Sequence, residues 1–322
     1  MSSEPGKVRE RRRLSRAALT PFFATRPAAE VLLEACGSAH HWGRELQRLG
    51  HTVRLLPPHA VARYRTGNKT DRADAKALLE AARNEKVQRV PVKSVEQQAV
   101  VALHRLRQGY LQTRTARINA VRGHLREFGC VVPVGAQHLV PRAYEALETE
   151  AVPALLRPAL VAVLEEIQAL EVQAEAVRAE LSRLAAQMPD AQRLLTIPGI
   201  GVLTATALVA FVGEAGRFRS GRDFAAYLGL TPREVSSGTV RRLGPITKRG
   251  NSYVRMLLIH GARAALRAGT VSQTPDDLRT WACALAERKG HNVAAIALAN
   301  KLARVAWRVW RDQRPFERRD PR

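Results

Sequence analysis

The sequence predicts an α/β domain at the N-terminus, then a long helical segment, then a second domain built of helices. Strand and helix patterns alternate up to about residue 90, and the chain then reads as two long helices between about 94 and 188. Helical patterns continue to about residue 312. With 322 residues, 46% of them hydrophobic, the chain can form about two domains of ~150 residues, each with its own core.

The N-terminal domain is predicted to alternate short strands and helices. Residues 7–14 alternate weakly, which fits an edge strand or a disordered basic arm. Residues 29–37 fit a helix, because Glu30 and Glu34 are four apart, or a short buried strand between a proline and a glycine. The other expected elements are a helix near 16–25, a helix over 38–50 ended by Gly50, a strand over 51–58, and a helix over 71–84 capped by Asn68 or Thr70.

The two long helices carry a heptad repeat. In the second helix, apolar residues recur at alternating spacings of three and four, a pattern typical of coiled coils. They are Leu160, Val163, Ile167, Leu170, Ala174, Val177, Leu181 and Leu184. In the first helix, Leu111, Ile118 and Leu125 are seven apart. Pro133 and Pro141 mark the connection. An antiparallel helical pair, an intermolecular coiled coil and a solvated helical spacer all fit this pattern.

The charge balance points to a polyanionic partner. There are 52 Lys and Arg residues against 29 Asp and Glu residues, a formal net charge of +23. Such an excess favours nucleic acid or an anionic membrane surface. No run of 18 apolar residues exists, and no helix combines a cationic face with a large aromatic face, so a membrane partner is not expected. A basic surface kept for solubility is the alternative.

The cysteines and the N-terminal residues predict a reduced, cytoplasmic setting. Cys36, Cys130 and Cys283 lie far apart and form no CxxC pair, so neither a disulfide framework nor a zinc site is expected. Residues 1–15 are charged, but no apolar segment follows them, so they do not form a signal peptide.

Residues 196–213 match a helix-hairpin-helix pattern in which the segment 198–201, Pro-Gly-Ile-Gly, forms the turn. Gly199 and Gly201 would let backbone N–H groups approach a phosphate at the N-terminus of the next helix. Such a contact holds a nucleic-acid backbone without reading its sequence. An ordinary pair of helices with a glycine corner is the alternative.

A basic stretch with a serine pair follows the glycine turn. Ser236 and Ser237 precede Gly238, and a turn there could present a hydroxyl to solvent. A serine needs a base or an electropositive pocket to act as a nucleophile, and arginines could stabilise a phosphoryl-transfer transition state. The basic residues, opposed by the single acid Glu234, are Arg233, Arg241, Arg242, Lys248, Arg249 and Arg255. A plain surface turn is the alternative.

Three acids near the N-terminus form a candidate metal site. Asp71 and Asp74 are three residues apart, so both carboxylates leave the first turns of a helix on the same side. Paired carboxylates are the usual ligands of Mg²⁺. Glu34 interrupts an apolar run, and a buried carboxylate is costly without a metal or a partner. The alternatives are acids favoured by the helix dipole and a solvent-exposed Glu34 on an amphipathic helix.

The C-terminal residues 291–312 predict a helix with Lys301, Arg304 and Arg308 on one side. Trp307 and Trp310 are expected to pack against the domain, and stacking on nucleic-acid bases is the alternative. Residues 313–322 are predicted to be a disordered basic tail.

Residues 194–263 closely resemble the serine-containing DEDD transposases of bacterial insertion sequences, and most of the chain resembles them more loosely. The resemblance implies a RuvC-like (ribonuclease-H-like) domain over 1–92, a helical coiled-coil region over 93–189 and a serine transposase domain over 190–312. It implies that Ser237 is the nucleophile that attacks DNA, with Glu34, Asp71 and Asp74 as the second, third and fourth acids of a Mg²⁺ site. It also implies a structured guide RNA and a homo-oligomer, dimer or tetramer, in which the acids and the serine meet.

The chain departs from the family at its start. These transposases open with a strand of the type Gly-Ile-Asp whose aspartate is the first acid, and no such strand precedes Glu34. We therefore expect a truncated family member. Two other functions stay open at this point: a junction-resolving, metal-dependent nuclease that needs no serine, and an inactive nucleic-acid-binding remnant.

Overall fold

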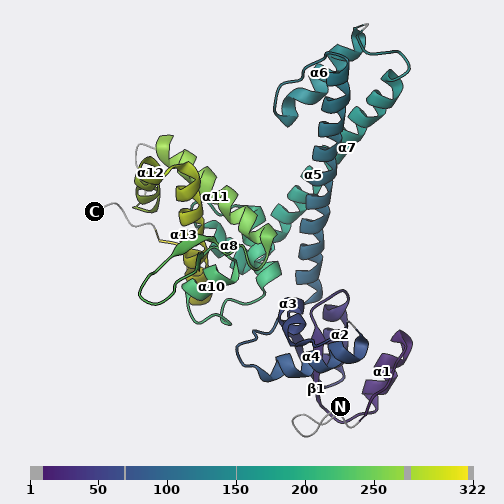
Figure 1. Ribbon diagram of the computed structural model, residues 1–322, viewed down its shortest axis with the longest axis vertical. Coiled ribbons are helices and arrows are strands. Elements are labelled where there is room, and N and C mark those ends of the chain that lie inside the picture. The colour runs from purple at the N-terminus through teal and green to yellow at the C-terminus, as the bar shows by residue number, and fades with distance from the viewer. Residues whose placement is uncertain (1–9, 69, 150, 272–276, 318–322) are drawn as a thin grey trace. The chain divides into compact units, whose positions relative to one another are not determined.

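The computed structural model describes residues 10–68, 70–149, 151–271 and 277–317. It is mostly helical, and the described residues form two sheets of two strands each. The chain divides into two compact units, residues 1–96 and 97–322 (Figure 1). None of the described helices is long and apolar enough to cross a membrane.

The first unit is built around a parallel pair of short strands. β1 (Glu30–Glu34) pairs with β2 (Thr52–Leu56), and α2 (Ala39–Arg48) connects them. Residues 29–37 therefore contain a strand and no helix, because pairing with β2 supplies hydrogen bonds to their backbone groups. The other elements are α1 (Arg16–Ala24), α3 (Pro58–Val61), the 3-10 turn η1 (Ala62–Tyr64) and α4 (Asp71–Arg83).

Helix α4 closes the core of this unit. Ala77 and Ala81 of α4 pack with Leu56 and Val61 in one buried cluster. The helix begins as predicted, because the Thr70 hydroxyl accepts a hydrogen bond from the Ala73 N–H at 3.2 Å. Of the two alternatives for residues 7–14, the edge strand is not formed over residues 10–14, which have no regular structure, and residues 7–9 lie outside the described residues.

In the second unit, two long helices pair within one chain. α5 (Val95–Glu127) and α7 (Arg157–Gln187) run antiparallel, since Arg114 bonds Glu171 and Arg117 bonds Glu166, each at 2.8 Å (Figure 1). Every seventh residue of the predicted stripe is buried: Leu160, Ile167, Ala174 and Leu181. The heptad repeat thus describes an intramolecular helical pair, which was one of the predicted alternatives.

A third helix lies between the two long ones in the sequence. α6 (Ala136–Glu148) buries Leu139, Ala143 and Leu147 against the pair. Pro141, which was expected to mark the connection between the long helices, lies inside α6. A proline in a helix removes one backbone hydrogen bond, and the burial of three side chains outweighs this loss here.

The remaining helices share one hydrophobic core. They are α8 (Pro189–Leu195), α9 (Val202–Ala207), the π-helical turn η2 (Leu208–Val212), α10 (Gly221–Tyr227), α11 (Ser252–Val271), α12 (Asp277–Lys289) and α13 (His291–Asp312). Trp307 and Trp310 are buried, as predicted. Their indole N–H groups donate to Ala215 O at 3.1 Å and to Asp190 Oδ2 at 2.9 Å.

The first residues after α13 contact the domain, unlike the predicted disordered tail. The Gln313 amide donates to Asp190 Oδ1 at 2.9 Å, and the Phe316 N–H donates to Thr196 Oγ1 at 2.7 Å. Residues 318–322 of the predicted tail lie outside the described residues.

Candidate nucleic-acid interface and serine site

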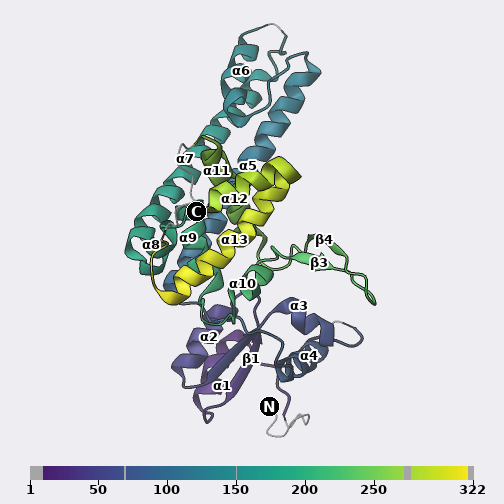
Figure 2. The ribbon, with the colours of Figure 1, turned by 90° about the vertical axis from the view of Figure 1, so that its left-hand side faces the viewer.

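The basic stretch forms a hairpin that stands out from the helices of the second unit (Figure 2). β3 (Pro232–Glu234) pairs antiparallel with β4 (Leu243–Ile246). At its base, the Thr247 N–H donates to Thr231 O at 2.9 Å, and the Lys248 N–H donates to Gly229 O at 3.1 Å. The hairpin is therefore fixed at its base, and the rest of its length faces solvent.

The two serines of this hairpin have different surroundings. The Ser236 hydroxyl donates to Glu234 Oε1 at 2.8 Å and accepts from the Arg242 N–H at 3.2 Å, so it braces the two strands. The backbone of Ser237 pairs with Val240 across the turn, at 3.3 and 3.1 Å. Among the described residues, none hydrogen-bonds the Ser237 hydroxyl, and Ser237 is exposed. Ser237 is therefore the serine whose hydroxyl is available to react.

The five predicted contact cations are all exposed: Arg233, Arg241, Arg242, Lys248 and Arg249. Arg241 also bonds Glu234, at 3.3 Å. Arg255 has a different task, because its guanidinium donates to Leu228 O at 3.1 Å and to Arg249 O at 2.8 Å and so holds the hairpin base. The hairpin thus combines an accessible hydroxyl with exposed positive charge.

Apolar side chains are exposed on the same hairpin. Val235 is 73% exposed, and Val240 and Leu243 are exposed by more than half. An isolated two-stranded hairpin is marginally stable in water, and exposed apolar side chains on it favour a surface that a partner covers.

The glycine turn joins α8 to α9. Gly199 has a positive φ of 90°, and a Cβ there would lie 3.0 Å from Gly261 O on α11. A Cβ on Gly261 would lie 2.0 Å from Gly199 O. These two glycines allow the turn and α11 to touch, so close packing accounts for the glycine at position 199. Gly201 is exposed, and a Cβ there would meet nothing within 4 Å, so its backbone is the more accessible of the two predicted contacts.

The three candidate metal ligands all lie in the first unit. Glu34 ends β1 and is half-buried, while Asp71 and Asp74 lie in the first turns of α4. Asp74 bonds Arg65 at 3.0 Å. Among the described residues, no three His, Cys, Asp or Glu side chains form a group that could hold a metal ion. These carboxylates therefore do not fit a metal site by themselves.

A buried polar cluster was not predicted to have a role. His104 on α5 is completely buried, with Nδ1 2.9 Å from the Tyr253 hydroxyl of α11 and Nε2 3.0 Å from Thr206 Oγ1 of α9. Burial, and then the nearby charge of Arg107, lowers the pKa of His104 to about 4. A signal was present in the sequence, because His104 lies seven residues before Leu111 in the heptad repeat.

Two family models match the chain. One is described as Transposase IS116/IS110/IS902 family and matches residues 191–276, which include the glycine turn and the hairpin. The other is described as a transposase and matches residues 5–129, which include the three acids.

Curated transposases resemble the chain over most of its length. It is 44% identical over 300 residues to a probable family 20 transposase of Pseudomonas aeruginosa, which covers 92% of this chain and 88% of that protein. It is 40% identical to the transposase for insertion sequence element IS1111A of Coxiella burnetii, in a match that covers 97% of this chain and 86% of that protein. It is 38% identical to the transposase for insertion sequence element IS1328 of Yersinia enterocolitica, in a match that covers 94% of this chain and 90% of that protein. These matches define an insertion-sequence transposase, a class of protein that acts on DNA. The chain belongs to the IS110/IS116 family of DEDD transposases.

Proposed function

We propose that the chain carries out transposition through nucleophilic attack of Ser237 on a DNA phosphodiester. The observation that carries this proposal is the difference between the two serines. Ser236 is held by Glu234 and by the Arg242 backbone, whereas Ser237 is exposed with an unbonded hydroxyl among the described residues. In the attack, a bond forms between Ser237 Oγ and phosphorus, and a phosphorus–oxygen bond of the DNA breaks. The serine proton leaves to solvent, and the released DNA oxygen takes up a proton.

The exposed cations of the hairpin support this step. Guanidinium groups donate paired hydrogen bonds to phosphate oxygens and stabilise the charge that develops on them. Arg233, Arg242 and Arg249 are exposed, and we assign them and Lys248 to contacts with the DNA backbone. In the proposal, the helix-hairpin-helix turn adds backbone N–H contacts at Gly201 and Gly199.

The resemblance supplies the other parts of the proposal. It supports our proposal of a RuvC-like fold for residues 1–92, a structured guide RNA and a homo-oligomer. The cytoplasmic location that we propose depends instead on the three widely separated cysteines. The resemblance also implies Mg²⁺ as the metal, with Glu34, Asp71 and Asp74 as its ligands. Since these carboxylates form no metal-holding group among the described residues, the proposed step uses the serine and the cations alone. Cleavage measured with and without a chelator tests the metal.

A strand-exchange assay on plasmids that carry the element's ends tests the serine. We expect Ser237→Ala to abolish recombination products. Ser236→Ala is the matched control, because it removes a neighbouring hydroxyl that braces the hairpin, and we expect it to retain activity at a reduced level. DNA cleavage by Ser237→Ala at the wild-type rate would instead indicate a metal-dependent nuclease. Binding without cleavage by the wild type would indicate an inactive remnant.

A further inference from the structure

A cationic pocket lies in the second unit between α10, α12 and α13. It has a volume of about 610 Å³ and is lined by Arg222, Lys301, Arg304, Arg308, Ser220 and Leu278, among others. None of these residues belongs to the β3–β4 hairpin or to the glycine turn. The pocket therefore gathers positive charge at a second place.

The local structure explains how the cations converge. Lys301, Arg304 and Arg308 are spaced by three and four on α13, so they share one helix face, as the sequence predicts. α10 reaches that face because residue 221 is glycine: a Cβ there would lie 3.2 Å from the Cα and O of Arg304. Arg222, the next residue, thereby joins the cations of α13 in the lining of the pocket.

The charges of the pocket are not fully compensated. Arg308 bonds Asp312, and Asp277 acts on Lys301 by its charge. Burial, and then the charge of the neighbouring Arg304, lowers the pKa of Lys301. Within the described part of the chain, no carboxylate pairs with Arg222 or Arg304. A bound anion would relieve this repulsion.

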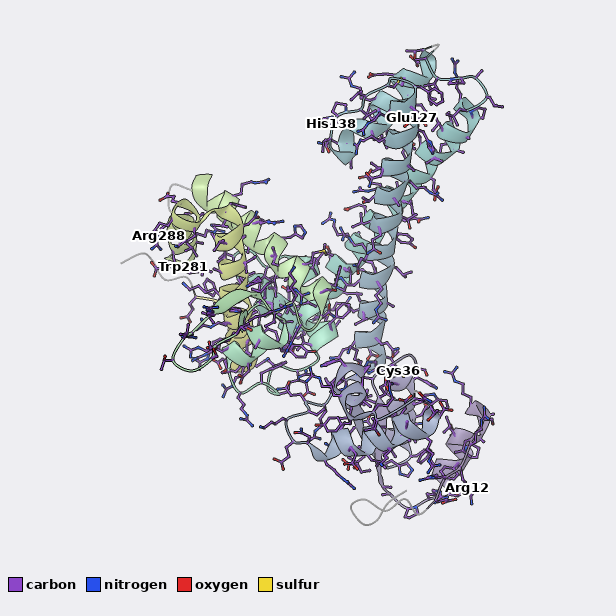
Figure 3. The ribbon with its side chains drawn as sticks, in the orientation of Figure 1. Arg12, Cys36, Glu127, His138, Trp281 and Arg288 are labelled. Carbon is purple, nitrogen blue, oxygen red and sulfur yellow. The ribbon has the colours of Figure 1, made fainter. Side chains whose placement is uncertain are left out.

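The donors of the pocket suit a phosphate group. Ser220 Oγ accepts from the Asp223 N–H at 3.2 Å, so its own O–H remains able to donate. Arginine forks match phosphate oxygens in pairs. The aromatic rings nearby are already engaged: the Lys301 ammonium lies 3.6 Å from the ring centroid of Trp281, a residue of α12 labelled in Figure 3. Trp307 is buried, so its ring face is not open to a base. These contacts favour a backbone phosphate over a stacked base.

We propose that this pocket binds a backbone phosphate of a nucleic acid, outside the segment that carries Ser237. The inference rests on the proposed function only for the identity of the polyanion. DNA and RNA share this chemistry, and the experiment separates them.

The test measures affinity of the full chain for a short DNA duplex, and separately for a hairpin RNA, over a range of salt concentrations. The variant is Arg222→Gln with Arg304→Gln. The control is Arg105→Gln with Arg126→Gln, which removes the same charge from exposed positions on α5. Each phosphate contact contributes about 0.9 to the slope of log affinity against log salt on duplex DNA. We expect the pocket variant to lower that slope by about 1 to 2, and the control to leave it unchanged.

If the pocket variant lowers the slope with the DNA duplex alone, the pocket binds DNA. If it lowers the slope with the hairpin RNA alone, the pocket binds RNA. An unchanged slope with both probes, or an equal decrease in the control, would overturn the proposal. Thermal unfolding of each variant, followed by tryptophan fluorescence, shows whether it is folded. If Ser237 is not the nucleophile, the Ser237→Ala variant still recombines DNA. That result does not change the salt slopes, so the two proposals can fail separately.

Discussion

His104 should make the second unit less stable in mild acid. Its pKa of about 4 lies below the ordinary histidine value near 6.5. The unfolded chain therefore binds a proton more readily than the folded chain between these two values. The stabilisation by neutral His104 is complete above the unfolded pKa and is lost as the pH falls from about 6.5 towards 4.

The hydrogen bonds explain why the neutral ring is preferred. The Thr206 hydroxyl donates to Val202 O at 2.7 Å, so its oxygen accepts from Nε2–H of His104. Nδ1 is then the acceptor for the Tyr253 O–H at 2.9 Å. A second proton on the ring would remove this acceptor and place a positive charge near Arg107. The full difference of about 2.5 pKa units corresponds to about 3 kcal/mol.

Urea unfolding followed by tryptophan fluorescence measures this effect. Between pH 7 and pH 5, we expect the wild type to lose about 2 kcal/mol of unfolding free energy through His104. His104→Gln keeps a polar side chain but does not titrate, so its loss should be smaller by that amount. Other acids titrate equally in both proteins, and the difference isolates His104. An equal pH dependence in the two proteins would refute the reasoning.

Three further predictions concern packing and capping. Gly261→Ala should lower stability by about 1 to 3 kcal/mol, because its Cβ would lie 2.0 Å from Gly199 O; Gly201→Ala meets no atom and should unfold at the wild-type temperature. Leu164→Ala should lower the free energy of unfolding, measured with denaturant, by about 2 to 5 kcal/mol, because Leu164 is buried between the long helices. Val172→Ala, at a position 70% exposed, should change that free energy little. Thr70→Ala should cost about 1 kcal/mol by removing the α4 cap, and an unchanged melting temperature would contradict this.

Local patterns predicted the two long helices, and non-local contacts decided elements that those patterns could not assign. Residues 29–37 could not be assigned from sequence, because the spacing of Glu30 and Glu34 favours a helix. Their strand depends on pairing with β2, about twenty residues away. Helix α6 was missed because Pro141 reads locally as a break, and its burial against the long helices is a tertiary effect.

The candidate site shows the same division. The sequence indicated a serine pair among cations, but it could not show that Ser236 is held by Glu234 while the Ser237 hydroxyl faces solvent. Gly199 was predicted as a phosphate contact from a motif, and its close approach to Gly261 depends on how α11 packs. The acids matched a family motif, yet Arg65 pairs with Asp74, a partner that a short motif does not contain.

The most direct measurement of the central claim is to trap the reaction on DNA and digest the covalent product with protease and nuclease. Mass spectrometry of the peptides then locates the attached phosphate. We predict a phosphoryl group on Ser237 and none on Ser236. A phosphate attached to any other residue, or efficient recombination with no covalent intermediate, would contradict the account.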